Sequence, residues 1–338
     1  MARTRSLRST QKRKSRARRR LPRAPHTRQI CPGMEIPANI PGLDTAIALH
    51  TQGDYDQAIE HLCAAITDDL PALYQVVCLK MLVEWCAQQD RPMDAKHHSG
   101  RAVAIADKAF GARDIMTLML RNSHLYWMNV CGYGEVAQKY YPALVDDIEQ
   151  ALGRDHDLCW AARNNAIMPL KDQGLWEEAA EAYQQLADDM SDYLYASHPN
   201  LLAVRRHLGQ AYSMAGHYDR AISVFSDLLA TLLTTTSRGN DTILSLRDDI
   251  AENHFYAGRK DDARDMWTVL AADCLRYLGP AHPLTIRQHT IQISFAIDDG
   301  DEIAVDQWMQ RLREAIPPDG DMSDLPPLEF LIRNPWAD

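Results

Sequence analysis

The chain has 338 residues, of which 46% are hydrophobic and 24% are charged, and its formal net charge is −10. This composition is that of a globular protein and excludes the disordered class. No run of about 18 uncharged apolar residues occurs, which excludes a membrane-spanning helix, and no apolar run follows the N-terminus as a secretory signal would require. Seven dispersed cysteines without a Cys-x-x-Cys pair indicate reduced thiols. We therefore expect a cytoplasmic protein without membrane insertion.

The charge is distributed unevenly along the chain. Residues 1–28 carry 12 of the 36 Lys and Arg residues and none of the 46 acidic residues, which leaves a net charge of −22 on the remainder. We expect residues 1–34 to be a basic disordered tail, because they are poor in apolar side chains. Three roles are open: a weak contact with nucleic acid or an acidic surface, a targeting signal, or a solvated tail. Translation could also begin at Met34, which would remove the tail from the natural product.

After Pro37 and Pro41 the pattern predicts a short helix at about residues 43–51, and from there a turn motif recurs. In its full form the motif is Gly, an aromatic residue two places on, and Ala five places on. The step between turn positions is 42 residues from the second copy onward, and such a fixed period is the signature of repeat proteins. In the seventh copy the turn position falls on Asp299 or Gly300, and Asp299 gives the better alignment. The earlier turn positions are Gly53, Asp90, Gly132, Gly174, Gly216 and Gly258.

The apolar pattern of each unit predicts two helices, one before the turn and one after it. Around Gly216, apolar residues recur every three or four places on both sides, which is the period of an amphipathic helix. A glycine can end the first helix because it adopts positive φ without strain. Ala221 is small where the two helices cross, and we expect the large residue four places after each such position to pack in the core. These residues are Leu62, Tyr141, Tyr183, Phe225, Trp267 and Trp308.

The links between units also repeat. His198-Pro199 and His282-Pro283 lie two periods apart, and His156, Asp114 and Asn240 occupy the same phase in other units. Because Pro suits the first turn of a helix and Asp or Asn caps its free amides, these positions predict helix starts rather than metal ligands.

These motifs resemble tetratricopeptide repeats, and in particular the 42-residue type of kinesin light chains and many bacterial repeat proteins. The resemblance rests on the phase-locked turns and on segments such as Leu278-Gly279-Pro-Ala-His282-Pro283 and Arg163-Asn164-Asn165-Ala166. It implies an all-α protein, a right-handed α-solenoid of about seven stacked helical hairpins over residues 35–315. We expect residues 316–338, acidic and then apolar, to cap the last hairpin, with docking to a partner as the alternative.

In the family, residues about ten, six and three places before the turn position line a concave groove that binds a peptide. The groove expected here is mixed or basic in its middle and acidic in the sixth unit. Such polar groups can bond to the backbone of an extended peptide, although a solvated face without ligand is also possible. The predicted groove residues are Asn122, Tyr126, Asn129, Asn164, Asn165, Met168, Lys171, Arg206, Gln210, Ser213, Asp248 and Glu252.

Arginine recurs eleven residues before four of the turns, at Arg121, Arg163, Arg205 and Arg247. Two roles are open for this series. The arginines could pair with acidic residues of the neighbouring unit and hold the stacking register, which we favour, or they could face a ligand.

No phosphate-binding loop, nucleophile elbow or His-Glu-x-x-His motif occurs in the sequence, and His97-His98 point apart on a helix. We expect no enzyme activity, cofactor or metal. The predicted function is a protein- or peptide-binding scaffold or adaptor. The alternatives are a peptide-responsive signalling regulator, or an interaction arm that works with a separately encoded signalling ATPase.

Overall fold

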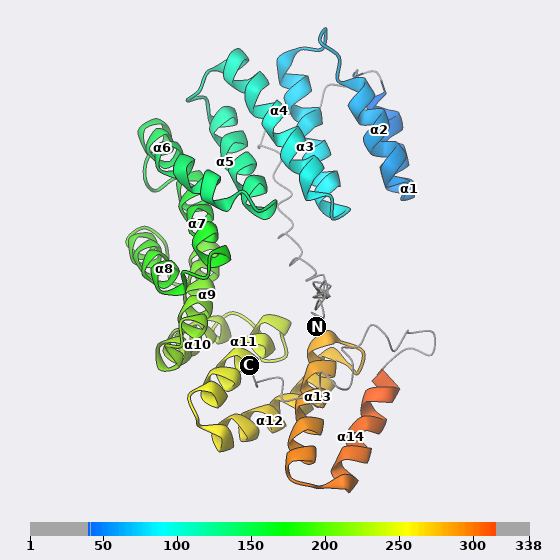
Figure 1. The fold of residues 1–338 in the computed structure, drawn as a ribbon, viewed down its shortest axis with the longest axis vertical. Helices are drawn as coiled ribbons and strands as arrows, with labels where there is room; N and C mark the ends of the chain where they lie inside the picture. The colour runs from blue at the N-terminus through cyan, green and yellow to red at the C-terminus, as the bar shows by residue number, and fades with distance from the viewer. Residues whose placement is uncertain (1–39, 41, 316–338) are drawn as a thin grey trace, which may run out of the picture. The chain divides into compact units, whose positions relative to one another are not determined.

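The computed structural model describes residues 40 and 42–315, and the helices of this part belong to one compact unit. The expected N-terminal tail and C-terminal cap lie outside the described residues, so both remain predictions. The described residues form fourteen helices and no strand, an α-solenoid of seven helical hairpins (Figure 1). The helices are α1 (Leu43–Gln52), α2 (Tyr55–Ala65), α3 (Ala72–Gln88), α4 (Pro92–Phe110), α5 (Ile115–Val130), α6 (Gly134–Leu152), α7 (Asp157–Asp172), α8 (Trp176–Ser191), α9 (Pro199–Met214), α10 (Tyr218–Leu233), α11 (Asp241–Tyr256), α12 (Lys260–Leu278), α13 (Pro283–Asp298) and α14 (Glu302–Ala315).

Each odd-numbered helix is the first of its hairpin and each even-numbered helix is the second, and we number the hairpins 1 to 7. Every helix packs against its neighbours in sequence, and α7 also contacts the first helices on either side, α5 and α9. The first helices of the middle hairpins therefore lie side by side on one face.

The turns within the hairpins follow the predicted pattern, with one correction. Asp90 takes the turn position of hairpin 2 with a φ of 54°, so the Asp occupies the left-handed region that glycine adopts elsewhere. In hairpin 7 the prediction of Asp299 was wrong. Gly300 has the positive φ of 68°, whereas Asp299, which directly follows α13, keeps a right-handed backbone with a φ of −80°. The 42-residue step is therefore kept, and Val305 takes the place that Ala has in the other hairpins.

The helix starts are capped as predicted. His156 Nδ1 accepts a hydrogen bond from the amide of Leu158 at 3.1 Å. His198 and His282 cap α9 and α13 in the same way, and the carboxylate of Asp114 and the amide oxygen of Asn240 cap α5 and α11. These five side chains satisfy free amide groups in the first turn of their helices.

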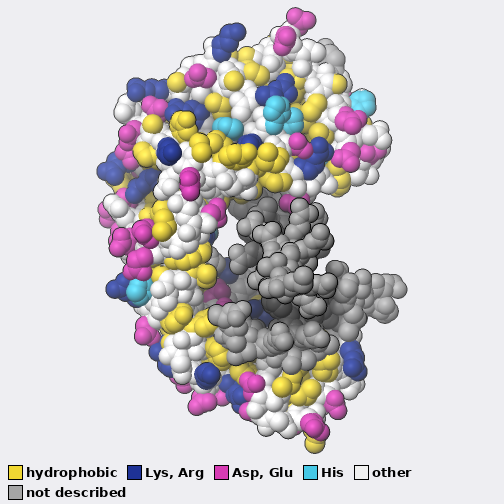
Figure 2. Space-filling view, in the orientation of Figure 1, with side chains coloured by type: hydrophobic (Ala, Val, Ile, Leu, Met, Phe, Trp, Pro, Cys, Tyr) yellow, Lys and Arg dark blue, Asp and Glu magenta, His cyan; other side chains and the backbone are white. Residues whose placement is uncertain are grey.

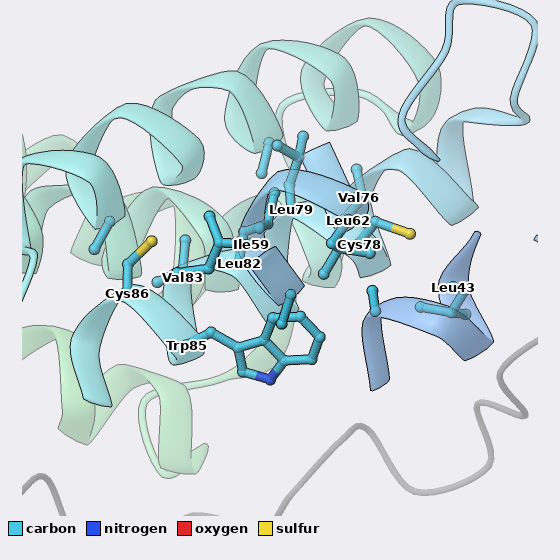
Figure 3. Packing of buried hydrophobic residues seen from close by; sticks show 14 of the residues in the cluster. Leu43, Ile59, Leu62, Val76, Cys78, Leu79, Leu82, Val83, Trp85 and Cys86 are labelled. Carbon is cyan, nitrogen blue, oxygen red and sulfur yellow. The ribbon is translucent and has the colours of Figure 1, made fainter. Parts of the chain in front are cut away.

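The core lies between the helices of each hairpin and between successive hairpins. The large residues predicted for it are buried in hairpins 1 and 3 to 6, and Trp308 in hairpin 7 is partly buried. Between hairpins 1 and 2, the side chains of α2 interlock with those of α3 (Figure 3). Gly209 leaves room for Phe225, since a Cβ on this glycine would lie 2.5 Å from the phenyl ring. The six cysteines of the described residues are free thiols, as expected.

Candidate functional site

The predicted groove residues lie on the surface formed by α5, α7, α9, α11 and α13, which we call the first-helix face. On this face, polar side chains join each first helix to the next. The bonded residues are mostly 43 places apart, one more than the repeat, because adjacent helices are offset by one residue. The bonds are Asn122–Asn165 (3.1 Å), Asn164–His207 (3.3 Å), Arg206–Asp249 (3.4 Å) and Asn129–Asp172 (2.9 Å).

Two of the predicted residues lie between helices rather than on an open surface. Asn122 is 8% exposed and Asn129 is 3% exposed. The amide oxygen of Asn122 accepts the bond from Asn165, and Asn129 donates its amide to Asp172. Both side chains therefore hold successive first helices in register.

Asp248 is also an interhelical residue, with 6% of its surface exposed. Its carboxylate accepts three hydrogen bonds of 2.8 Å, from Trp267 Nε1, Arg287 Nε and Gln288 Nε2. A buried carboxylate needs such partners because its desolvation is otherwise costly. The joint between hairpins 6 and 7 is thus built around one buried charge. A buried Trp that needs an acceptor was the sequence signal for this pairing.

The other nine predicted residues are partly exposed on the first-helix face. They are Tyr126, Asn164, Asn165, Met168, Lys171, Arg206, Gln210, Ser213 and Glu252.

The charged groups on this face are partly exposed and yet strongly desolvated. Burial lowers the pKa of Lys171, and this ammonium has no ion pair within the described residues. Desolvation raises the pKa of Asp249 to about 6 and also raises the pKa of Glu252, although 26% and 27% of these side chains remain exposed. Such groups gain when an opposite charge approaches, because their charged forms are poorly solvated. The first-helix face therefore carries a cluster of desolvated charges on α7, α9 and α11.

The charge of this part of the first-helix face is more balanced than the sequence indicated. Arg206 reaches Asp249, and Arg287 of α13 donates to both Asp248 and Glu252. Three carboxylates thus face two guanidinium groups, so the acidic part retains a small excess of negative charge. Arg287 was not among the predicted residues, because the motif of the seventh unit is irregular.

The arginine series pairs within its own hairpin, which corrects our expectation of pairing between units. Arg121 donates to Asp147 at 2.8 Å and Arg247 donates to Asp273 at 2.6 Å, and Arg163 donates to Asp189 in the same way. In each pair the Asp is 26 residues later, on the second helix. Hairpin 5 has Thr231 at this position, and there Arg205 has only a 3.4 Å contact with Ser191 Oγ.

One Ser–His contact resembles a nucleophile pair but lacks its geometry. Ser99 Oγ lies 3.0 Å from His124 Nδ1, and its hydroxyl is also 2.9 Å from the carbonyl oxygen of Lys96. The carbonyl oxygen of Lys96 and the imidazole both lie within reach of the single hydroxyl proton, so His124 is not a dedicated base for Oγ. Ser99 is 1% exposed, so a substrate has no access to it.

Two further searches of the described part of the chain gave negative results. No group of three or more His, Cys, Asp or Glu side chains there could hold a metal ion. None of its helices is both long enough and apolar enough to cross a membrane.

Figure 2 shows hydrophobic side chains gathered over α3 to α5 and acidic side chains on the edge beside α8.

Solved structures with the same fold are tetratricopeptide-like repeat proteins. No protein-family model matches the sequence, and the comparison with curated proteins gives no match. Kinesin light chain TPR-like repeats from Podosopora anserina are 17% identical, with a TM-score of 0.55 over 61% of this chain and 98% of that one. A signal transduction ATPase with a tetratricopeptide repeat sensor from Pyrococcus horikoshii is 12% identical, with a TM-score of 0.59 over 81% of this chain and 41% of that one.

The quorum sensor NprR from B. thuringiensis, in its apo form, is a third similar structure. It is 12% identical, with a TM-score of 0.52 over 81% of this chain and 83% of that one. At these identities the similarity concerns the fold. The chain therefore has the tetratricopeptide-like repeat fold that its motifs predicted, and such folds are in general non-catalytic.

Proposed function

We propose that this protein is a non-catalytic scaffold or adaptor, and that the first-helix face binds an extended segment of a partner protein. The group of partly exposed polar side chains on α7, α9 and α11 is the observation that carries this proposal. It combines partly exposed amide side chains, which can bond to a peptide backbone, with desolvated charges that gain from a partner of opposite sign.

Lys171 is the residue on which the proposal depends most. Its ammonium group is desolvated, and burial lowers its pKa more than the nearby carboxylate of Asp172 raises it. Among the described residues, no carboxylate forms an ion pair with it within 4.0 Å. A carboxylate or carbonyl oxygen of a bound segment would stabilise the charged form. Met168 lies one helical turn before Lys171 and offers an adaptable apolar contact beside it.

The proposal can be tested by affinity capture from a native lysate with the full chain as bait. Met168→Glu/Lys171→Glu alters side chains that take no part in the bonds between first helices. Asn164→Ala/Arg206→Ala breaks two of those bonds, and Tyr195→Glu, in the exposed loop between α8 and α9, serves as a control. We expect a partner bound by the wild type to be lost with Met168→Glu/Lys171→Glu and kept with Tyr195→Glu. Equal capture by all variants would contradict binding on the first-helix face.

A second candidate function is a regulator that responds to a bound peptide. The bonds between first helices favour it, because a ligand that replaces Asn164–His207 or Arg206–Asp249 would change the spacing of hairpins 4 to 6. The quorum sensor and the ATPase sensor among the similar structures show that the same fold serves in sensing proteins. A change in the radius of gyration on addition of the captured partner segment, measured by small-angle X-ray scattering, would support this function over a static scaffold. A separately encoded ATPase in the captured complex would instead support the role of an interaction arm.

A further inference from the structure

The turns within the hairpins form a second surface, which we call the turn edge. At three places on this edge, the third residue after one turn position pairs with the first residue after the next turn position. Asp56–Arg91 (3.0 Å) and Asp219–Arg259 (2.8 Å) are ion pairs, and Glu177–His217 (2.7 Å) is a hydrogen bond. These pairs join hairpin 1 to 2, hairpin 4 to 5 and hairpin 5 to 6. The repeat thus brings these two positions together at each step.

The same positions are mostly apolar in the steps from hairpin 2 to 4. Met93 and Tyr133 take them between hairpins 2 and 3, and Glu135 and Leu175 take them between hairpins 3 and 4. Met93 is 53% exposed, Tyr133 44% and Leu175 38%, so solvent reaches large apolar side chains where three of the other four steps carry polar pairs. The remaining step, from hairpin 6 to 7, has Asp261 and Asp301 at these positions.

Helix α6 extends this apolar surface. Val136 and Tyr140 follow Tyr133 by three and seven residues, which places all three on one side of the helix, and they are 42% and 59% exposed. Lys96 Nζ lies 3.9 Å from the centre of the Tyr133 ring, which joins hairpin 2 to this ridge. Gln138, which accepts a hydrogen bond from Gln173 at 3.3 Å, lies two residues from both Val136 and Tyr140 and so on the other side of α6, where Leu175 follows α7. The turn-edge patch therefore consists of Met93, Tyr133, Val136 and Tyr140.

We propose that the turn-edge patch binds an amphipathic helix of a partner protein. Its central ridge has the three- and four-residue spacing that packs into the groove of another helix. Tyrosine and methionine are enriched in protein interfaces. Tyrosine supplies a large contact area at a low entropic cost, and methionine adapts its shape to a partner surface. Isolated exposed apolar residues are normal, but a contiguous set that replaces polar pairs is not.

The charged residues beside the turn-edge patch indicate the charge of the partner helix. Lys96 contacts the patch and Lys139 is exposed beside Tyr140, whereas Glu135 is the acidic residue of this stretch of α6. Because most of the chain is acidic, a basic border distinguishes the patch from its surroundings. The partner helix therefore carries apolar residues three and four places apart, flanked by Asp or Glu that meet Lys96 and Lys139.

The test places a photo-cross-linking residue, p-benzoylphenylalanine, at Tyr140 of the full chain in cells. Tyr195, in the loop between α8 and α9, receives the same residue as a control because its exposure of 65% is similar to the 59% of Tyr140. We expect a cross-link from position 140 and none from position 195. The attached segment, identified by mass spectrometry, should show the apolar spacing with acidic flanks.

A synthetic peptide of the attached segment then provides the quantitative test. We expect its Kd for the full chain to rise at least tenfold with Val136→Glu, and the melting temperature of this variant to stay unchanged because Val136 is on the surface. Lys139→Glu should also weaken binding, and a peptide with Lys in place of its acidic flanks should recover affinity for that variant. Met168→Glu/Lys171→Glu should leave peptide binding unchanged, so that this result does not depend on the proposed function of the first-helix face.

Three outcomes would overturn the proposal. The first is a cross-link to a second copy of the chain, which would make the patch a homodimer contact. The second is a segment without the expected pattern, and the third is no cross-link above that of position 195.

Discussion

Two stretches of the turn edge have the same backbone arrangement but opposite chemistry. Between hairpins 4 and 6 the contact positions carry Glu177–His217 and Asp219–Arg259, and between hairpins 2 and 3 they carry Met93 and Tyr133. The stacking of hairpins is the same in both, because it depends on the buried residues below the edge. The comparison shows that the side chains on this edge are free to specify contacts with other molecules without affecting the fold.

The largest expected effect concerns the core that both stretches share. Tyr141 lies under the apolar stretch and Phe225 under the charged one, and each is 1% exposed. We expect Tyr141→Ala and Phe225→Ala to lower the free energy of unfolding by about 3–5 kcal/mol each, as for other large aromatic deletions. Urea unfolding followed by circular dichroism measures this.

A matched variant separates volume from polarity at the same site. The hydroxyl of Tyr141 is buried without a hydrogen-bond partner. Tyr141→Phe removes this unsatisfied group and keeps the ring, so we expect equal or higher stability, by up to about 1 kcal/mol. A loss comparable to that of Tyr141→Ala would mean that the hydroxyl has a partner in solution.

The second prediction concerns pH and hairpins 5 and 6. Burial raises the pKa of Asp249 from 3.8 to about 6, so between these values the folded protein holds a proton that the unfolded chain releases. The contribution of Asp249 to stability therefore falls as pH rises from about 4 to 6. We expect Asp249→Asn to lose less stability than the wild type between pH 4.5 and 7, as measured by urea midpoints.

Asp219→Asn, on the exposed turn edge, is the control for that experiment. Its pH profile should follow that of the wild type. Parallel profiles for Asp249→Asn and the wild type would show that the carboxylate of Asp249 is better solvated than its surroundings indicate.

A smaller effect is expected where the arginine–aspartate pair is interrupted. Thr231→Asp places a carboxylate opposite Arg205, as in hairpins 3, 4 and 6. We expect a gain of about 0.2–1 kcal/mol, the range of partly exposed ion pairs. Differential scanning calorimetry at low salt measures it, with Thr231→Asn as the uncharged control. The interpretation would be wrong if the gain persisted when Arg205 was replaced by Ala.

The smallest effect on stability should come from exchanging the chemistry of the turn edge itself. Met93→Asp with Tyr133→Arg reproduces the charged step of hairpins 5 and 6 in the apolar stretch. Because these residues are exposed, we expect the free energy of unfolding to change by less than about 0.5 kcal/mol. The cross-link from position 140 should nevertheless be lost. A large drop in melting temperature would show that the patch stabilises the fold and is not free for a partner.

Much of the fold was predictable because its signals are local. The positive φ at Asp90, the caps at His156 and Asn240 and the burial of Trp267 each follow from one residue and its place in the period. The error at Asp299 has a similar origin. The position of Ala304 indicated an earlier turn, whereas the backbone kept the left-handed region for Gly300.

The candidate site was less predictable, because it depends on contacts between distant residues. The sequence does contain a sign of the partners of the arginine series. Asp147, Asp189 and Asp273 each follow an arginine of the series by 26 residues. Nothing local, however, says that these residues face the arginines of their own hairpin rather than those of the next one. The burial of Asn122 and Asp248 likewise depends on how closely adjacent first helices approach.

The sequence by itself determined the helices, their turns and caps, and the repeat, because helical periodicity and backbone preference act within a few residues. Only the tertiary structure decided which polar side chains pair and which stay open. The pairing of Arg206 with Asp249, the burial of Asp248 and the exposure of the ridge from Tyr133 to Tyr140 depend on the offset between packed helices. An offset of one residue moves a side chain from the solvent into a joint, and this offset results from the packing of all the hairpins together.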